Sequence, residues 1–187
     1  GEFVLDLSAY SLLRSLARAA TYFGGTCRQW LFDNPKIVVL ERHGDAVRFH
    51  PLLLELAGHF HVQLRVCAPR KANQKGRVER AIRYLRERFL AGRTIVGVDH
   101  GNDELAVFRD DLALPRPHPT RAERTVLDCL AEERERLPPV PDPLPPTDLV
   151  APLNADKTAF VRFDRNLYSV PPDFACRTLT LAADDHL

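Results

Sequence analysis

Residues 65–93 read RVCAPRKANQKGRVERAIRYLRERFLAGR, a basic stretch that also carries the apolar repeat of a helix. It holds ten Lys or Arg residues and only two acids, Glu79 and Glu87, so its net charge is +8. The whole chain of 187 residues carries only +1. Positive charge is therefore concentrated here, and such clustering indicates a surface for an anionic partner.

The second half of this stretch is predicted to be an amphipathic helix over residues 77–90. Its apolar residues recur at intervals of three and four, at Val78, Ile82, Leu85 and Phe89. Glu79 lies beside this stripe, at the border between core and solvent. It can pair with Arg83 one turn later, or it can bind a metal ion, and its position on the helix leaves both open.

The residues before this helix alternate between strand and helix patterns. Strands are expected at 2–7, at 30–32 with an extended continuation at 36–40, and at 62–67. Helices are expected at 10–23 and 51–60. A polar loop is expected at 42–46 and a basic loop at 69–76. This alternation is typical of an α/β layer fold.

The residues after it are more varied. Helices are expected at 102–112 and at 120–137, where Thr120 and Glu123 have capping-box spacing. Residues 138–152 contain seven prolines and read as an extended linker. Three short strands follow, at 159–163, 167–170 and 176–182, with a turn at 164–166.

Composition excludes several classes of protein. The apolar fraction of 45% fits a chain with a real core. Long apolar runs and a signal peptide are lacking, so no membrane span is expected. The four cysteines are scattered, which fits a reducing cytosol. The seven histidines have no ligand spacing. We expect a cytoplasmic bacterial protein, and, because the chain contains no Met, a fragment of a longer one.

Asp33 is the second candidate acid. It follows an apolar strand, and ligands gather at the carboxyl ends of strands in open α/β sheets; Asp is also common in turns for local reasons. If the fold brings Asp33 and Glu79 together, they can share Mg²⁺ or Mn²⁺, since hard cations prefer carboxylate oxygens. Two such ions beside a phosphodiester support phosphoryl transfer.

A basic surface around such acids would bind phosphates without choosing a sequence. The candidate DNA-binding residues are Arg70, Lys71, Lys75, Arg77, Arg80 and Arg83, and Arg86 extends the same basic surface. A merely solvated basic face is the plain alternative.

Several segments resemble the retroviral-integrase-like (RNase H fold) core of DDE transposases, above all the IstA-type transposases of insertion sequences. The segments are YFGG at 22–25, LFDNPKIVV at 31–39, FHPLLLELAGHF at 49–60 and PRKANQKGRVERAIRYLRERF at 69–89. FDRNLYSVPPDFACRTLTL at 163–181 resembles the small β-barrel that follows this core in the family. The resemblance covers nearly the whole chain.

The resemblance implies that Asp33 matches the second acid of the DDE triad and Glu79 the third. The first acid has no match, because residues 2–7 correspond to a later strand and Asp6 does not fit. The expected organisation is a partial RNase H-like integrase core at 1–112, a helical extension at 113–137, a Pro-rich linker at 138–152 and a small β-barrel-like module at 153–187, which is expected to be cut off before it closes.

The implied activity is DNA transposition by Mg²⁺- or Mn²⁺-dependent 3′-end hydrolysis and strand transfer. The implied partners are transposon-end and target DNA, further copies of the chain and an AAA+ ATPase helper. With two of three acids, this chain is expected to be inactive alone. A non-enzymatic DNA-binding or assembly module, or another RNase H-like nuclease, remains the alternative.

Overall fold

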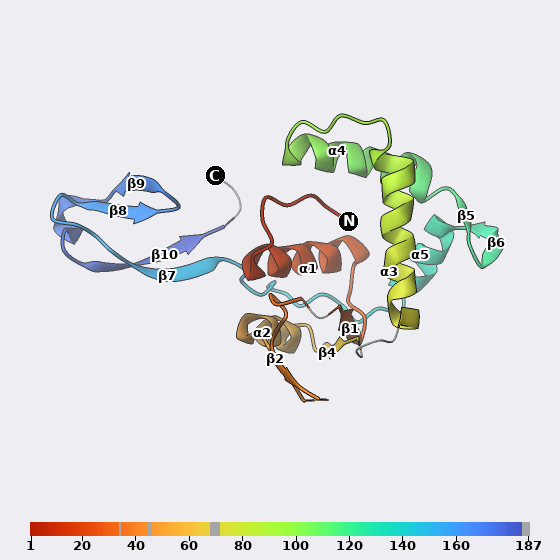
Figure 1. Cartoon of the computed structure of the whole chain (residues 1–187), viewed down its shortest axis with the longest axis horizontal. Helices are drawn as coiled ribbons and strands as arrows, with labels where there is room; N and C mark the ends of the chain where they lie inside the picture. The colour runs from red at the N-terminus through yellow and green to blue at the C-terminus, as the bar shows by residue number, and fades with distance from the viewer. Residues whose placement is uncertain (34, 45, 68–71, 185–187) are drawn as a thin grey trace. The chain divides into compact units, whose positions relative to one another are not determined.

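The computed structural model describes residues 1–33, 35–44, 46–67 and 72–184, and for residues 72–77 it describes the backbone alone. The chain divides into two compact units, Gly1–Pro145 and Pro146–Leu187. The first mixes helices and strands, and the second is built mainly from strands (Figure 1). The predicted α/β class is confirmed for the first unit.

Two parallel strands form the centre of the candidate site. β1 (Gln29–Phe32) pairs with β4 (Gln63–Val66) in a register that runs from Gln29–Gln63 to Phe32–Val66. Both strands were predicted from their short apolar runs. Because the strands are parallel, the segments that leave their carboxyl ends start from the same edge of the sheet.

Helices α1 (Ala9–Phe23) and α2 (Pro51–His59) pack against each other beside these strands (Figure 1). Both were predicted from helical apolar spacing, and Ser8 caps α1 as its hydroxyl accepts a hydrogen bond from the Ser11 amide at 3.1 Å. The core consists of Leu13, Ala17, Ala20, Val38, Val39, Leu53, Leu56, Phe60 and Val62. Trp30 packs on Phe60 with ring centroids 5.7 Å apart.

A β-hairpin connects β1 to α2. β2 (Val39–His43) pairs with β3 (Ala46–Phe49) in antiparallel fashion. The prediction of a polar loop over residues 42–46 was therefore wrong. Gly44, with a φ of +61°, adopts the left-handed conformation that the turn of a hairpin uses.

The first residues do not form the predicted strand at 2–7. The Phe3 backbone instead pairs with a distant side chain: its amide donates to Asn102 Oδ1 at 2.7 Å, and Asn102 Nδ2 donates to the Phe3 carbonyl at 3.1 Å. The Asn102 amide group thus takes the place of a neighbouring strand. The apolar pattern of residues 2–7 predicts an extended backbone, but it does not show whether another strand or a single side chain will pair with that backbone.

The basic stretch forms one long helix with a wider final turn. α3 runs over Ala72–Leu85, so helix replaces most of the basic loop predicted at 69–76, and a π-helical turn continues it over Arg86–Leu90. Residues 69–71 of that prediction lie outside the described residues. α4 (Val98–Phe108) crosses the end of this helix (Figure 1), and it starts four residues before the helix predicted at 102–112.

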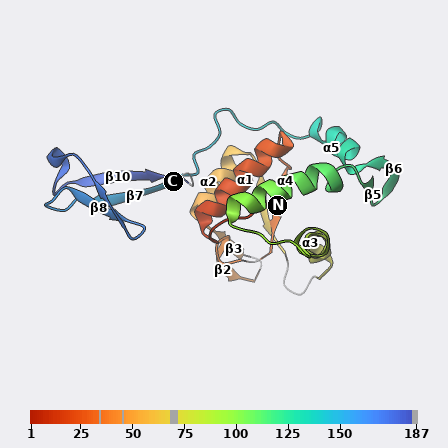
Figure 2. The ribbon, with the colours of Figure 1, turned by 90° about the horizontal axis from the view of Figure 1, so that it is seen from above.

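A second hairpin precedes the last helix of this unit. β5 (Pro117–His118) pairs with β6 (Arg121–Thr125), and α5 (Val126–Arg134) packs beside them (Figure 2). The predicted start of this helix at Thr120 was wrong, because the helix begins at Val126. Thr125 and Asp128 form the actual capping box: the Asp128 amide donates to Thr125 Oγ at 3.1 Å, and the Thr125 amide donates to Asp128 Oδ2 at 2.9 Å.

The end of α1 is latched to residue 138. Gly24 ends the helix with a φ of +72°, a left-handed conformation that favours glycine. A Cβ atom on Gly25 would lie 2.5 Å from the Pro138 carbonyl oxygen, and the Thr26 amide donates to that same oxygen at 3.0 Å. We call Gly25, Thr26 and Pro138 the latch.

The second unit contains two antiparallel strand pairs. β7 (Leu149–Asn154) pairs with β10 (Thr178–Ala183), and β8 (Phe160–Phe163) pairs with β9 (Asn166–Ser169). β8, β9 and β10 were predicted, and β7 was missed because it starts inside the proline-rich segment. Pro152 is tolerated opposite Thr180 because β7 has β10 as its only partner among the described strands.

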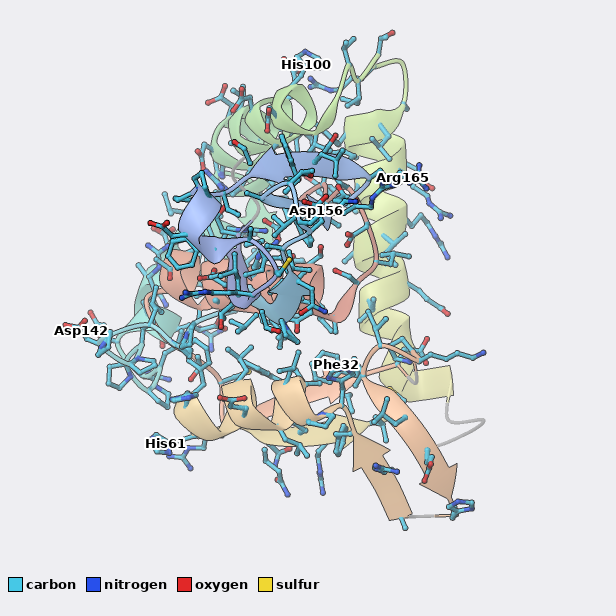
Figure 3. The ribbon with its side chains drawn as sticks, turned by 90° about the vertical axis from the view of Figure 1, so that its left-hand side faces the viewer. Phe32, His61, His100, Asp142, Asp156 and Arg165 are labelled. Carbon is cyan, nitrogen blue, oxygen red and sulfur yellow. The ribbon has the colours of Figure 1, made fainter. Side chains whose placement is uncertain are left out.

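Asp156 organises the turn before β8 (Figure 3). Its Oδ1 accepts hydrogen bonds from the Thr158 hydroxyl at 2.7 Å, the Thr158 amide at 2.8 Å and the Phe160 amide at 3.0 Å. The bond from the Thr158 hydroxyl, followed by that from the Phe160 amide, lowers the pKa of Asp156 below its usual 3.8. A carboxyl whose pKa is lowered by folding stabilises the fold above its usual pKa, and that contribution is lost as the pH falls through the folded value.

We therefore expect the hydrogen-exchange protection of the Phe160 amide to be constant near neutral pH and to decline as the pH falls below about 3.8. Asp156→Asn should lower this protection near neutral pH and remove most of its pH dependence. Asp173→Asn, at an exposed position of the same unit, serves as the control. An unchanged pH profile in Asp156→Asn would contradict the role given to the carboxylate.

Candidate functional site

Asp33 directly follows β1, at the carboxyl edge of the two parallel strands. The pairing continues to this edge, where the Cys67 amide donates to the Phe32 carbonyl at 2.9 Å (Phe32 is labelled in Figure 3). Asp33 is exposed, so a ligand can reach it from solvent. Its position agrees with the prediction that an acid stands at the carboxyl end of a strand. The next residue, Asn34, lies outside the described residues.

Glu79 lies in the second turn of α3, the helix that follows β4. Its side chain is exposed, and it makes no hydrogen bond or ion pair with the residues that the structure describes. Arg83, one turn later, is also exposed and forms no ion pair within the same part of the chain. The simple helix pair between Glu79 and Arg83 is thus not formed, and the Glu79 carboxylate keeps all its acceptor positions for a ligand.

The two acids are carried by segments that leave the same edge of the sheet. Asp33 follows β1, and α3 begins at Ala72 after β4 ends at Val66. Across the described ranges, no group of three or more His, Cys, Asp or Glu side chains is arranged to hold a metal ion. Asp33 and Glu79 have the donor chemistry that suits Mg²⁺, but two carboxylates leave most of its six positions to water, phosphate or a further acid.

Three arginines of α3 and its π-helical turn lack carboxylate partners among the described residues. They are exposed on α3 and the π-helical turn, at Arg83, Arg86 and Arg88. Three other exposed arginines of the first unit do pair with acids: Arg18 with Glu2, Arg48 with Glu41 and Arg93 with Glu104. Unpaired guanidinium groups on one helix are what a phosphate-binding surface requires.

The predicted DNA-binding residues lie along α3 and the segment before it. Arg80 and Arg83 are exposed on α3. Lys75 and Arg77 belong to α3 by their backbone, and their side chains lie outside the described residues, as do Arg70 and Lys71 entirely. Arg86, also predicted for the basic surface, is exposed on the π-helical turn, and the prediction omitted only Arg88, which is exposed on the same turn.

Histidine ligation receives no support from the geometry. His61 and His100 are at opposite ends of the view in Figure 3. His100 is engaged locally, since its Nδ1 accepts a hydrogen bond from the Val96 amide at 3.2 Å. Every helix in the described residues is too short or too polar to cross a lipid bilayer.

Comparison with known proteins gives consistent matches. Residues 137–187 match the family described as Mu transposase, C-terminal domain. The chain is 33% identical over 176 residues to the transposase for insertion sequence element IS21 of Pseudomonas aeruginosa, which covers 92% of the chain and 45% of that protein.

Two further relatives have the same kind of name. The transposase for insertion sequence element IS640 of Shigella sonnei is 40% identical over 100 residues, covering 53% of the chain and 32% of that protein. The transposase for insertion sequence element IS21-like of Bacteroides fragilis is 24% identical over 157 residues, covering 82% of the chain and 29% of that protein. The chain therefore spans less than half the length of these relatives.

Proposed function

Because the chain is homologous to the transposases of IS21-type insertion sequences, we propose that it is part of a DDE transposase. The first unit would belong to its RNase H-like catalytic core, and the second would be a DNA-contacting or assembly module. The observation that carries this proposal is the exposed Glu79 carboxylate, which has no partner among the described residues. It stands on the same helix as Arg83, which also has no carboxylate partner in that part of the chain.

In this proposal Asp33 and Glu79 hold divalent cations together with a third acid outside residues 1–187. When bound, Mg²⁺ would supply charge stabilisation for the attacking and leaving oxygens at the phosphodiester. The residues of this chain orient the site: β1 and β4 fix the edge from which both acids arise, and the arginines of α3 hold the DNA backbone beside them. The same resemblance makes a second copy and an AAA+ ATPase helper proposed partners.

The DNA-binding part of the proposal is tested by removing the unpaired arginines together. In Arg83→Gln/Arg86→Gln/Arg88→Gln, the slope of log affinity for duplex DNA against log salt should become shallower by about three, because each phosphate contact contributes about 0.9 to the slope. Fluorescence anisotropy of a labelled duplex over a salt series gives this slope.

The matched control removes three arginines that already have carboxylate partners. Arg18→Gln/Arg48→Gln/Arg93→Gln changes the net charge by the same amount and should leave the slope close to that of the unaltered chain. Equal slopes for the two triple variants would show that only total charge matters, and the α3 surface would then have no special role.

A non-enzymatic DNA-binding module is the second candidate for this chain by itself. It is favoured by the lack of a three-ligand cluster among the described residues. DNA binding that does not change with Mg²⁺ and is unaffected by Asp33→Ala supports this module. An affinity that rises with Mg²⁺ and loses that response in Asp33→Ala supports the metal site.

A further inference from the structure

Tyr84 on α3 makes contact with an arginine from a distant part of the chain. The Arg116 guanidinium carbon lies 4.1 Å from the centroid of the Tyr84 ring, and the Phe108 ring packs on the same tyrosine with centroids 5.8 Å apart. Arg116 is fixed at its backbone, where its carbonyl accepts a hydrogen bond from the Val126 amide at 3.0 Å. The first turn of α5 thus holds an arginine over α3.

Arg116 has no carboxylate to neutralise it within the described part of the chain. Its side chain is half-buried, and its Nε is buried without a hydrogen-bond partner. Arg93 offers a comparison, since it stacks on Phe89 at 5.0 Å but also pairs with Glu104. Both arginines lie on an aromatic ring, and only Arg93 has its charge compensated by an acid.

Because Arg116 stacks on Tyr84, the position of Tyr84 on the helix places Arg116 beside the basic residues of α3 and its π-helical turn. Arg80 precedes Tyr84 by four residues and Arg88 follows it by four, so both lie on its side of the helix. A guanidinium group stacked on an aromatic ring keeps the N–H groups at its edge available, and these match the oxygens of a phosphate.

We propose that Arg116 is a further phosphate-binding residue of this surface, held over α3 by the Tyr84 ring and directed at the backbone of duplex DNA. The inference rests on the proposed function, because it assigns Arg116 to the DNA surface of α3. It adds a contact from a segment 36 positions after Arg80, outside the basic stretch. The Tyr84 ring replaces a carboxylate as the support for this guanidinium, so its charge is not cancelled.

The test compares single variants of the 187-residue chain by anisotropy with a labelled duplex over a salt series. Arg116→Gln should make the log–log salt slope shallower by about one. Arg116→Lys keeps the charge and should keep the slope. Arg93→Gln removes an arginine of equal charge and similar stacking, and it should leave the slope unchanged because Glu104 already compensates that charge. Thermal unfolding of each variant identifies any loss of fold.

The outcomes separate this inference from the proposed function. An unchanged slope in Arg116→Gln, beside a shallower slope in the triple variant of Arg83, Arg86 and Arg88, overturns the role of Arg116 and leaves the α3 surface standing. Unchanged slopes in Arg116→Gln and in the triple variant overturn both the role of Arg116 and the proposed DNA-binding surface of α3. A slope that becomes shallower equally in Arg116→Gln and Arg93→Gln also overturns the inference, because the effect then does not depend on an uncompensated charge.

Discussion

Glu79→Gln is expected to lower the strand-transfer rate of a full-length transposase carrying this segment by about 10³-fold, which corresponds to about 4 kcal/mol of transition-state stabilisation. The substitution keeps the size of the side chain and removes the negative charge that would hold a divalent cation. Because Glu79 has no ion pair with the described residues, the change should cost little folding free energy. A strand-transfer assay with pre-cleaved ends and Mg²⁺ measures the rate.

Glu87→Gln is the matched control. Glu87 is the other acid of the basic stretch, it is exposed, and it lies on the π-helical turn eight residues later. Glu87→Gln should leave the strand-transfer rate within a factor of about two of that of the unaltered protein, since surface substitutions usually have small effects. DNA binding should persist in both variants. Full activity in Glu79→Gln would remove Glu79 from the proposed metal site.

Phe89→Ala is expected to lower the free energy of unfolding of the first unit by about 3–5 kcal/mol, the usual cost of truncating a buried phenylalanine. Phe89 is 1% exposed and lies at the meeting point of three segments. Its ring packs on Phe3 at 6.2 Å and on Phe108 at 5.3 Å, and Arg93 covers it at 5.0 Å. Removing the ring therefore loosens the N-terminal segment, α4 and the end of α3 together.

Urea unfolding followed by tryptophan fluorescence tests this prediction, because Trp30 is the single tryptophan of the chain and belongs to the first unit. Leu90→Ala is the control: its side chain is 39% exposed, and the expected loss is below about 1 kcal/mol. Equal midpoints for the two variants would contradict the central place given to Phe89.

Local patterns predicted the elements around the candidate site well. α1, α2, β1 and β4 were all found, because each has apolar spacing of one clear period and α1 has a capping serine and a terminal glycine pair. The position of Asp33 at the end of β1 followed from the same reasoning. These features depend on residues within a few positions of one another, which is the range over which a single sequence is informative.

The errors arose where distant residues decide the structure. Residues 2–7 have a strand pattern, yet Asn102, 99 positions after Phe3, pairs with the Phe3 backbone. The hairpin of β5 and β6 replaced the start of a predicted helix, because Thr125 competes with Thr120 as a cap and has the better-formed capping box. β7 was missed because seven prolines between 138 and 152 outweighed its alternating pattern.

In the candidate site, too, the features set by neighbouring residues could be predicted, and those set by distant residues could not. The basic stretch and Glu79 are visible in the sequence, because their helical spacing is local. Whether Glu79 pairs with Arg83 could not be predicted, since the alternative geometries differ by a few tenths of a kcal/mol. Arg116 could not be predicted either, because its contact with Tyr84 depends on how α5 is placed against α3.

Residues 22–25, at the end of α1 beside the latch, are constrained by packing and by backbone geometry. Tyr22 lies against the guanidinium groups of Arg109 and Arg134, at 4.8 and 5.6 Å from its ring centroid. Gly24 must adopt a positive φ, and Gly25 has the Pro138 oxygen where a side chain would begin. The YFGG segment thus joins distant parts of the chain, and its glycines are required by the geometry of the fold, independently of any chemistry at Asp33 and Glu79.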